Sequence, residues 1–217
     1  MQHTTVIVVA GGSSAHQPMP AGTALPEGAF VIAADSGIDR ARALGLDVDL
    51  AIGDFDSVSP SGLAAAVAAG ASIVRHPAAK DATDLELALD AALEHDPERI
   101  LVVGDGGGRL DHLLAVCALL ASQSYAGVIV DSYLGDTAVC VIRGSRTLVG
   151  AVGEVVSLLA YHGPATGITT SGLEYPLHNE SLGAGSTRGV SNVFSATEAT
   201  ITVTSGVLLA VQPGASS

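Results

Sequence analysis

The feature that most constrains the fold is a series of short apolar runs that alternate with helix-like segments over the first 135 residues. The runs are rich in Val and Ile and are not interrupted by polar residues at every second position, which is typical of parallel strands covered on both faces. The predicted strands are residues 4–10, 29–35, 48–54, 71–76, 99–105 and 126–132. This alternation predicts a doubly wound, mostly parallel α/β sheet domain.

Helices are expected between most of these strands, and capping signals mark where they begin. Thr83 and Glu86 have the spacing of a capping box, and Ser59 precedes a proline at a first helical position. The expected helices and their N-terminal caps are residues 37–44 with Ser36, 60–69 with Ser59, and 84–95 with Thr83. A further helix at 109–122 is so apolar that we expect it to be mostly buried.

After residue 135 the helical pattern stops, and short β-prone runs are separated by glycines. These runs are residues 138–144, 146–150, 154–163, 166–172, 198–206 and 207–214. They predict a small antiparallel β-sandwich domain. We therefore expect two domains, an α/β domain at 1–135 and a β-sandwich domain at 136–217.

Composition excludes several classes of function. The chain has 217 residues, a net charge of −13 and only 9 Lys and Arg, so it lacks the cations that nucleic acids or anionic membranes require. No apolar run approaches the ~20 residues that span a bilayer. No secretory leader is expected, and Cys117 and Cys140 are expected to be buried free thiols. We therefore expect a cytoplasmic protein.

Two aspartates separated by one residue, Asp54 and Asp56, follow the third predicted strand in the segment "GDFDS". Because ligands of an open α/β sheet bind beyond the carboxyl ends of its strands, Asp35, Asp81 and Asp84 are expected at the same edge. Each could instead be an ordinary turn or cap residue. However, carboxylates about 4 Å apart repel by about 4 kcal/mol at a dielectric of 20, which favours a cation among them. Oxygen ligands suit Mg²⁺, so we predict that Asp54 and Asp56 bind a metal.

Glycine-rich segments supply a second element of a phosphate site. Residues 9–14 follow the first predicted strand and residues 104–109 follow a later one, and such loops can direct backbone amides at anions. Arg109 can pair with a phosphate, and Asp111 and His112 follow it at the start of a helix. Neither loop matches a dinucleotide fingerprint or a P-loop, so a simple turn remains the alternative for each.

Taken together, the motifs resemble those of the thiamine pyrophosphokinase family, over about residues 6–211. They are "AADSG", "IGDFDS", "KDATDLELAL", "GGRLDH", "GLEYPLHNESL" and "GVSN", in this order. The resemblance implies a nucleotide-binding catalytic α/β domain, a thiamine-binding β-sandwich domain and a homodimer with its active site near the subunit interface. It also implies that ATP, Mg²⁺ and thiamine give thiamine diphosphate and AMP.

The resemblance, with the position of the loops, gives a set of expected site residues. The expected metal ligands are Asp54, Asp56 and Asp84, and the expected catalytic residues are these three with Arg109 and Asp111. The expected ATP-binding residues are Asp35, Gly37, Lys80, Asp81, Arg109 and His112. The expected thiamine-binding residues are Ser191 and Asn192. Lys80, the single lysine of the chain, is hypothesised to hold ATP phosphates.

The chain departs from the family pattern at three positions. Ser36 stands where a glycine is frequent, Leu87 where a lysine is frequent, and Val193 where a glutamate is frequent. The departures leave the metal carboxylates in place and bear on phosphate contacts and thiamine fit.

Two other functions are considered. One is a Mg²⁺-dependent phosphohydrolase, because "DFDS" resembles the D-x-D motif of haloacid dehalogenase-like enzymes, although it follows the third predicted strand instead of the first. The other is a nucleotide or thiamine sensor without catalysis, for which Leu87 and Val193 are the only support.

Overall fold

The structure, a computed structural model, describes residues 4–12, 19–20, 22–106 and 108–214. By internal contacts the chain divides into two units. Unit 1 is Met1–Leu110 with Val128–Asp136, and unit 2 is Asp111–Gly127 with Thr137–Ser217. The domain boundary expected after residue 135 stays a prediction, and the two divisions differ because residues 111–127 pack with the β-rich part of the chain.

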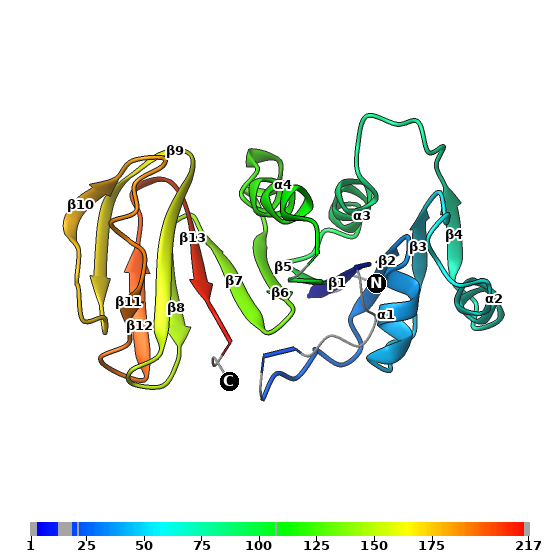
Figure 1. Ribbon diagram of the computed structural model, residues 1–217, viewed down its shortest axis with the longest axis horizontal. Coiled ribbons are helices and arrows are strands. Elements are labelled where there is room, and N and C mark those ends of the chain that lie inside the picture. The colour runs from blue at the N-terminus through cyan, green and yellow to red at the C-terminus, as the bar shows by residue number, and fades with distance from the viewer. Residues whose placement is uncertain (1–3, 13–18, 21, 107, 215–217) are drawn as a thin grey trace. The chain divides into compact units, whose positions relative to one another are not determined.

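Unit 1 contains the predicted parallel sheet (Figure 1). Its strands are β1 (Thr5–Ala10), β2 (Phe30–Ala34), β3 (Leu50–Gly53), β4 (Ser72–Arg75), β5 (Arg99–Gly104) and β6 (Ile129–Leu134). The order is β4-β3-β2-β1-β5-β6, and every neighbouring pair is parallel. The central strands are buried, as predicted. The expectation that residues 71–76 form a buried strand is wrong, because β4 is an edge strand and most of it is exposed.

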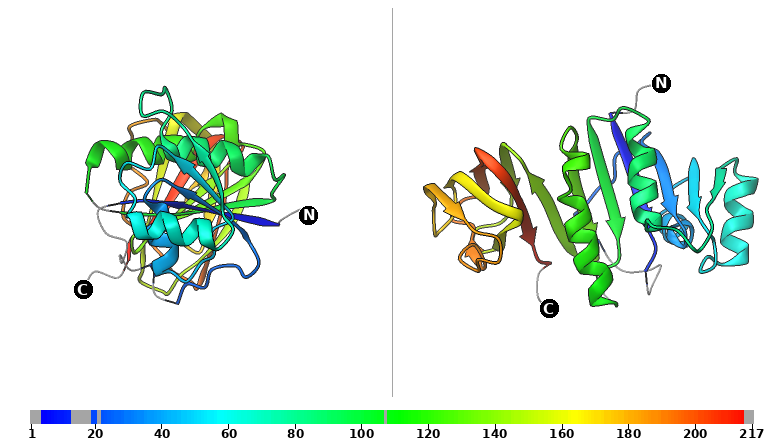
Figure 2. Two further views of the ribbon diagram at one scale, coloured as in Figure 1. Left: turned by 90° about the vertical axis from the view of Figure 1, so that its right-hand side faces the viewer. Right: turned by 90° about the horizontal axis from the view of Figure 1, so that it is seen from above.

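The helices α1 (Gly37–Ala43), α2 (Pro60–Ala68) and α3 (Asp84–Leu93) connect these strands, with α3 on one face of the sheet and α1 and α2 on the other (Figure 2). Two of the predicted caps are confirmed, since Ser59 accepts a hydrogen bond from the Gly62 N–H at 3.0 Å and Thr83 accepts one from the Glu86 N–H at 3.2 Å. The prediction for Ser36 is wrong, because its side chain makes no capping hydrogen bond.

Asp39, in the first turn of α1, holds the far end of the "GDFDS" loop. Its carboxylate accepts hydrogen bonds from the backbone N–H and the hydroxyl of Ser59, at 2.8 and 2.6 Å. A Cβ atom on Gly62 would lie 2.1 Å from Asp39 Oδ1, so this contact needs a glycine. The loop that carries Asp54 and Asp56 is therefore fixed to α1 before α2 begins.

The strand order reverses between β1 and β5, which is the point where open α/β sheets bind their ligands. Gly12 follows β1 and Asp105 follows β5, and a Cβ on Gly12 would lie 2.2 Å from the Cβ of Asp105. The two glycine-rich segments predicted from the sequence are thus in close contact at the reversal. Residues 13, 14 and 107 of those segments lie outside the described residues.

Unit 2 is built around an antiparallel sheet. Its strands are β7 (Thr137–Ile142), β8 (Ser145–Val149), β9 (Val155–Ser171), β10 (His178–Leu182), β11 (Asn192–Val193), β12 (Glu198–Thr202) and β13 (Ser205–Gln212). The order is β7-β13-β9-β12-β8, and β10 and β11 also pair with β9. All of the pairings within this unit are antiparallel, as predicted.

Strand β9 organises the second unit. The segments 154–163 and 166–172 were predicted as two strands, and they form one strand that passes through His162 at φ 55° and Gly163 at φ 150°. Its first half pairs with β13 and β11, and its second half pairs with β12 and β10. The core enclosed by these strands includes Leu158, Ile168 and Phe194.

Helix α4 (Leu110–Leu120) and the short helix η1 (Gln123–Tyr125) complete the fold. The prediction that α4 is mostly buried is wrong: of its residues only Leu120 is fully buried, while Leu110 is 68% exposed. Its C-terminal end is held by the Arg143 guanidinium, which donates to the carbonyl of Ser122 at 2.7 Å.

Neither cysteine forms a disulfide, as predicted, but the expectation that both are buried is wrong, since each is only partly buried. Among the described residues, no helix combines the length and the apolar character that crossing a membrane requires.

Candidate active site

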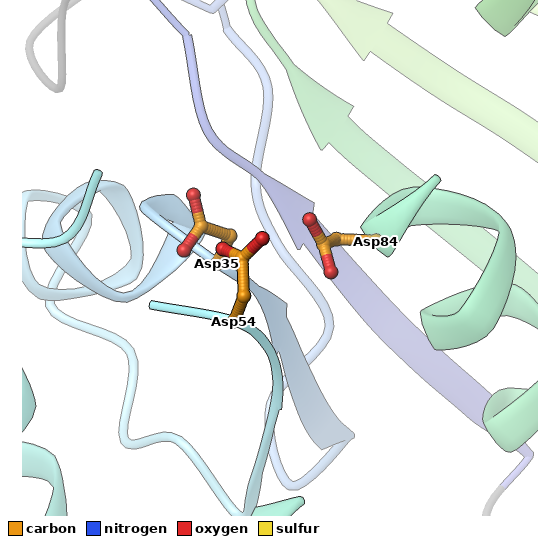
Figure 3. Close-up of side chains that lie close together, drawn as sticks. All are labelled: Asp35, Asp54 and Asp84. Atoms are coloured by element: carbon orange, nitrogen blue, oxygen red, sulfur yellow. The ribbon is translucent and has the colours of Figure 1, made fainter. Parts of the chain in front are cut away.

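Three carboxylates from separate segments meet at the carboxyl edge of the unit 1 sheet. Asp35 follows β2, Asp54 follows β3, and Asp84 is the first residue of α3. Figure 3 shows Asp84 extending from α3 toward the carboxylates of Asp35 and Asp54. Each offers one oxygen, and these oxygens lie within 4.8 Å of one another. The expectation that aspartates from different strand ends gather along one edge is confirmed for these three.

The backbone around the cluster is unusual in a way that positions the carboxylates. Asp35 and Phe55 have φ angles of 46° and 62°, in the left-handed region that non-glycine residues seldom adopt. Phe55 is only 9% exposed and packs among apolar residues. The other apolar residues of this cluster are Ala33, Ile38, Val48, Ala51, Val58, Leu63, Ala66 and Ile73. The buried ring therefore anchors a strained turn that carries an aspartate on each side.

Lys80 lies against the cluster. Its ammonium is 3.0 Å from Asp84 Oδ1 and 3.5 Å from Asp54 Oδ2, and its side chain is 14% exposed. The hydrogen bond to Asp84 is the largest influence on the pKa of Lys80 and raises it above its ordinary value. Lys80 is therefore a positively charged member of the site. Its contacts with the carboxylates were not predicted from the sequence, which assigned it to ATP binding.

Asp56 is exposed beside the cluster and is not one of the three closest carboxylates. Its backbone N–H donates to Asp54 Oδ1 at 3.3 Å, which is the largest influence that lowers the pKa of Asp54. The pKa of Asp56 is raised, mainly because the Asp54 carboxylate repels its negative charge. Partial loss of solvent around the carboxylate and the charge of Asp35 raise it further. The loop therefore holds Asp54 as the more acidic of the pair.

The raised pKa of Asp56 gives a prediction about stability. The ionised carboxylate is disfavoured in the folded state, so Asp56→Asn should raise the melting temperature of chelator-treated protein slightly at pH 7, because solvent screens an exposed charge. This gain is complete above the folded-state pKa and should fade as pH falls toward about 3.9, the pKa of an unfolded-state Asp. Calorimetric scans across this range measure it, with the exposed Asp47→Asn as control. A gain that persists at acid pH would contradict the prediction.

The residues present fit a divalent cation. Asp35 Oδ1 is buried and accepts no hydrogen bond from the described residues, while Asp35 Oδ2 accepts one from Ser57. A Cβ on Gly53 would lie 3.1 Å from Asp35 Cβ and 3.2 Å from Asp84 Oδ1, so the glycine keeps the space between these carboxylates open. An oxygen without a donor, in an all-oxygen set, is what a hard cation such as Mg²⁺ requires.

The remaining expected residues of unit 1 have different surroundings. Gly37 begins α1, where a Cβ would lie 2.0 Å from the Val9 carbonyl oxygen, so close packing of α1 on β1 requires this glycine. Asp81 and Arg109 are exposed. Sequence reasoning missed Arg75, whose guanidinium lies 4.8 Å from the centre of the Phe55 ring and donates to the Asp54 carbonyl at 3.4 Å. Its position at the carboxyl end of a strand, close to the edge where the aspartates gather, was the available signal.

The expected residues of unit 2 fall in two places. Asp111 and His112 are exposed in the first turn of α4. Ser191 is exposed at φ 59° beside Asn192, which is 6% exposed. The Asn192 side chain donates to the Tyr175 carbonyl at 2.8 Å and accepts from the Tyr175 N–H at 3.1 Å. Asn192 thus fixes the backbone of Tyr175, whose ring is exposed.

Unit 1 is a parallel sheet that gathers carboxylates at its carboxyl edge, and an antiparallel β unit follows it in the chain. This arrangement defines an α/β protein with an acidic edge suited to a divalent cation. The model of the thiamin pyrophosphokinase catalytic domain matches residues 23–130. The model of the thiamin pyrophosphokinase vitamin B1 binding domain matches residues 142–208. The chain belongs to the thiamine pyrophosphokinase family, as the sequence motifs predicted.

Individual similar proteins agree with this assignment. The thiamine pyrophosphokinase of Bacillus subtilis (strain 168) is 29% identical over 190 residues, which cover 81% of this chain and 85% of the relative. A crystal structure of thiamine pyrophosphokinase from Bacillus subtilis matches 97% of this chain and 99% of its own, with a TM-score of 0.82 and 25% identity. A crystal structure of a thiamin pyrophosphokinase family protein from Enterococcus faecalis matches 98% of this chain and 100% of its own, with a TM-score of 0.81 and 26% identity. The phosphohydrolase and sensor alternatives gain no support from these matches.

Proposed function

We propose that the protein is an ATP-dependent thiamine diphosphokinase that transfers a pyrophosphate group from ATP to the hydroxyl of thiamine. The observation that carries the proposal is the presence, in one chain and in order, of both domains of the family. In the reaction the thiamine hydroxyl oxygen bonds to the β-phosphorus of ATP, the bond from that phosphorus to the α–β bridging oxygen breaks, and AMP leaves. The hydroxyl proton is lost to a base or to water.

For the metal we propose Asp54 and Asp84, which belong to both the predicted set and the observed cluster, with Asp35 as a third oxygen donor. Asp56 stays a predicted ligand at the exposed rim of the cluster. A bound Mg²⁺ supplies charge neutralisation of the phosphate oxygens. The carboxylates and the buried Phe55 anchor hold the phosphate-binding edge in one geometry, because this reaction depends mainly on positioning.

The phosphates of ATP would lie over the strand reversal, where Gly12 and Asp105 are in close contact. Lys80 and the exposed Arg109 are the proposed cations for them, and Arg75 is a further cation beside Asp54. For thiamine we propose the surface formed by Ser191 and the segment that Asn192 holds. Asp111, Asp81 and His112 keep their predicted roles near the nucleotide.

The direct test is product analysis. Protein, ATP, MgCl₂ and thiamine should give equal amounts of thiamine diphosphate and AMP by mass spectrometry. Inorganic phosphate released without thiamine would instead support a phosphohydrolase, and thiamine or ATP binding without any product would support a sensor.

We further propose that the protein is a cytoplasmic homodimer. Apolar side chains are exposed along neighbouring segments of unit 2, and pairing of two copies would cover them. They are Val149, Val152, Val155, Tyr175 and Val190. Val155 pairs with β11, and Asn192 of β11 holds Tyr175, so these segments are adjacent.

The expected solution mass is twice the 21.5 kDa of one chain. Val149→Asp, at a side chain that is 71% exposed, should weaken the dimer at least about tenfold because it would bury a charge in the interface. Light scattering over a dilution series measures this. The matched control is Val67→Asp on α2 of unit 1, which is 54% exposed and should leave the mass unchanged. A monomer at micromolar concentration would contradict the proposal.

A further inference from the structure

The single lysine of the chain contacts two of the three carboxylates that are proposed to hold the metal. Its ammonium lies 3.0 Å from Asp84 Oδ1 and 3.5 Å from Asp54 Oδ2. Its side chain is 14% exposed, and those of Asp54 and Asp84 are 17% and 24% exposed. These three groups are therefore partly shielded from water, and their charges interact more strongly than those of a solvated surface pair.

Lys80 neutralises only part of the charge around it. Asp35, Asp54, Asp56 and Asp84 carry four formal negative charges. Lys80 and the Arg75 guanidinium beside Asp54 carry two positive charges, which leaves two negative charges. A divalent cation bound to Asp54 and Asp84 would share these carboxylates with the ammonium and repel it. ATP brings negative phosphate oxygens to the same edge, and they offer the ammonium a new partner.

We infer that Lys80 is a displaceable counter-ion that couples binding of the divalent cation to binding of ATP. This inference rests on the proposed function. Without nucleotide, Lys80 competes with the cation for Asp54 and Asp84 and keeps the affinity for free metal low. When ATP is bound, the ammonium moves from the carboxylates to the phosphates, and the carboxylates become available to the cation. Cation and nucleotide therefore strengthen each other's binding, by the same factor in both directions.

The experiment measures Mn²⁺ binding by the electron paramagnetic resonance signal of free Mn²⁺, with and without a non-hydrolysable ATP analogue. Lys80→Met keeps the length of the side chain and removes its charge. Without nucleotide, it should bind Mn²⁺ at least about tenfold more tightly than the wild type. The analogue should then strengthen Mn²⁺ binding by a smaller factor than in the wild type.

Two control variants separate this role from simpler ones. Arg42→Met removes one positive charge from an exposed position in the last turn of α1 and should leave Mn²⁺ affinity unchanged. Lys80→Arg keeps the charge and should retain part of the coupling. After chelator treatment, Lys80→Met should melt below the wild type, because the carboxylates lose their counter-ion. This readout does not depend on catalysis.

The outcomes are separable. If Lys80→Met binds free Mn²⁺ as the wild type does, or more weakly, the inference is overturned even when the wild type makes thiamine diphosphate. If the wild type binds no Mn²⁺ and makes no thiamine diphosphate, the proposed function fails and the inference fails with it. Tighter Mn²⁺ binding by Lys80→Met, with a smaller effect of the ATP analogue, supports the inference.

Discussion

Asp54→Asn should lower the rate of thiamine diphosphate formation by about 10²–10³-fold at saturating Mg²⁺ and ATP. Asp54 shares the closest carboxylate cluster with Asp35 and Asp84, and it also contacts Lys80. The amide keeps the shape of the side chain but removes the charge that a cation requires. The turnover number, measured by separating thiamine diphosphate from thiamine, is the quantity to compare.

The matched control is Asp47→Asn, which makes the same chemical change at an exposed position before β3. It should keep wild-type activity. Both variants should show the far-ultraviolet circular dichroism spectrum of the wild type, because the turn at Asp54 is anchored by Phe55. Activity of Asp54→Asn within a few-fold of the wild type, at limiting Mg²⁺, would remove Asp54 from the metal site.

The parallel sheet could be predicted because its central strands are buried on both faces and therefore read as continuous apolar runs. The same logic failed at β4, because its two apolar residues, Ile73 and Val74, do not show whether a strand lies at the centre or the edge of a sheet. It failed again for α4, whose exposed Leu110 and Leu114 look like core residues in the sequence. Exposure of an apolar helix depends on what packs against it, and that is a tertiary property.

The second unit shows a different limit of strand prediction from sequence. Strand β10, with the sequence "HNESL", was missed because it is polar, and β11 because it has two residues. Both exist because the long strand β9 offers them hydrogen-bonding partners. The glycine at 163 suggested a break between two strands, yet the strand continues through it, with His162 at φ 55°.

The acidic edge was predictable because chain direction places the carboxyl ends of parallel strands together. The membership of the closest cluster was predicted only in part. Asp54 and Asp84 were among the expected metal ligands, whereas the fold puts Asp35 in the place expected for Asp56. The turn at Phe55 directs Asp56 to an exposed position. The contact between Lys80 and Asp54 could not be predicted from the sequence either, because it joins residues that are 26 positions apart in the chain.

Phe55→Ala should destabilise unit 1 by about 3–5 kcal/mol, because it removes a buried ring and leaves a cavity among the apolar residues that surround it. The same change should lower activity, since the ring fixes the turn between Asp54 and Asp56 and supports the Arg75 guanidinium. Urea denaturation measures the loss. Phe30→Ala, at a partly buried phenylalanine that begins β2, is the control for loss of an aromatic ring outside this turn.

A comparison of Phe55→Ala with Phe55→Gly separates packing from backbone strain. At most positions glycine is less stable than alanine by roughly 0.5–1 kcal/mol, because the unfolded chain gains freedom. At φ 62° alanine keeps the strain that glycine relieves, so Phe55→Gly should be no less stable than Phe55→Ala. If glycine is clearly the worse of the two, the turn is not strained, and burial of the ring alone explains why a bulky residue stands between the two aspartates.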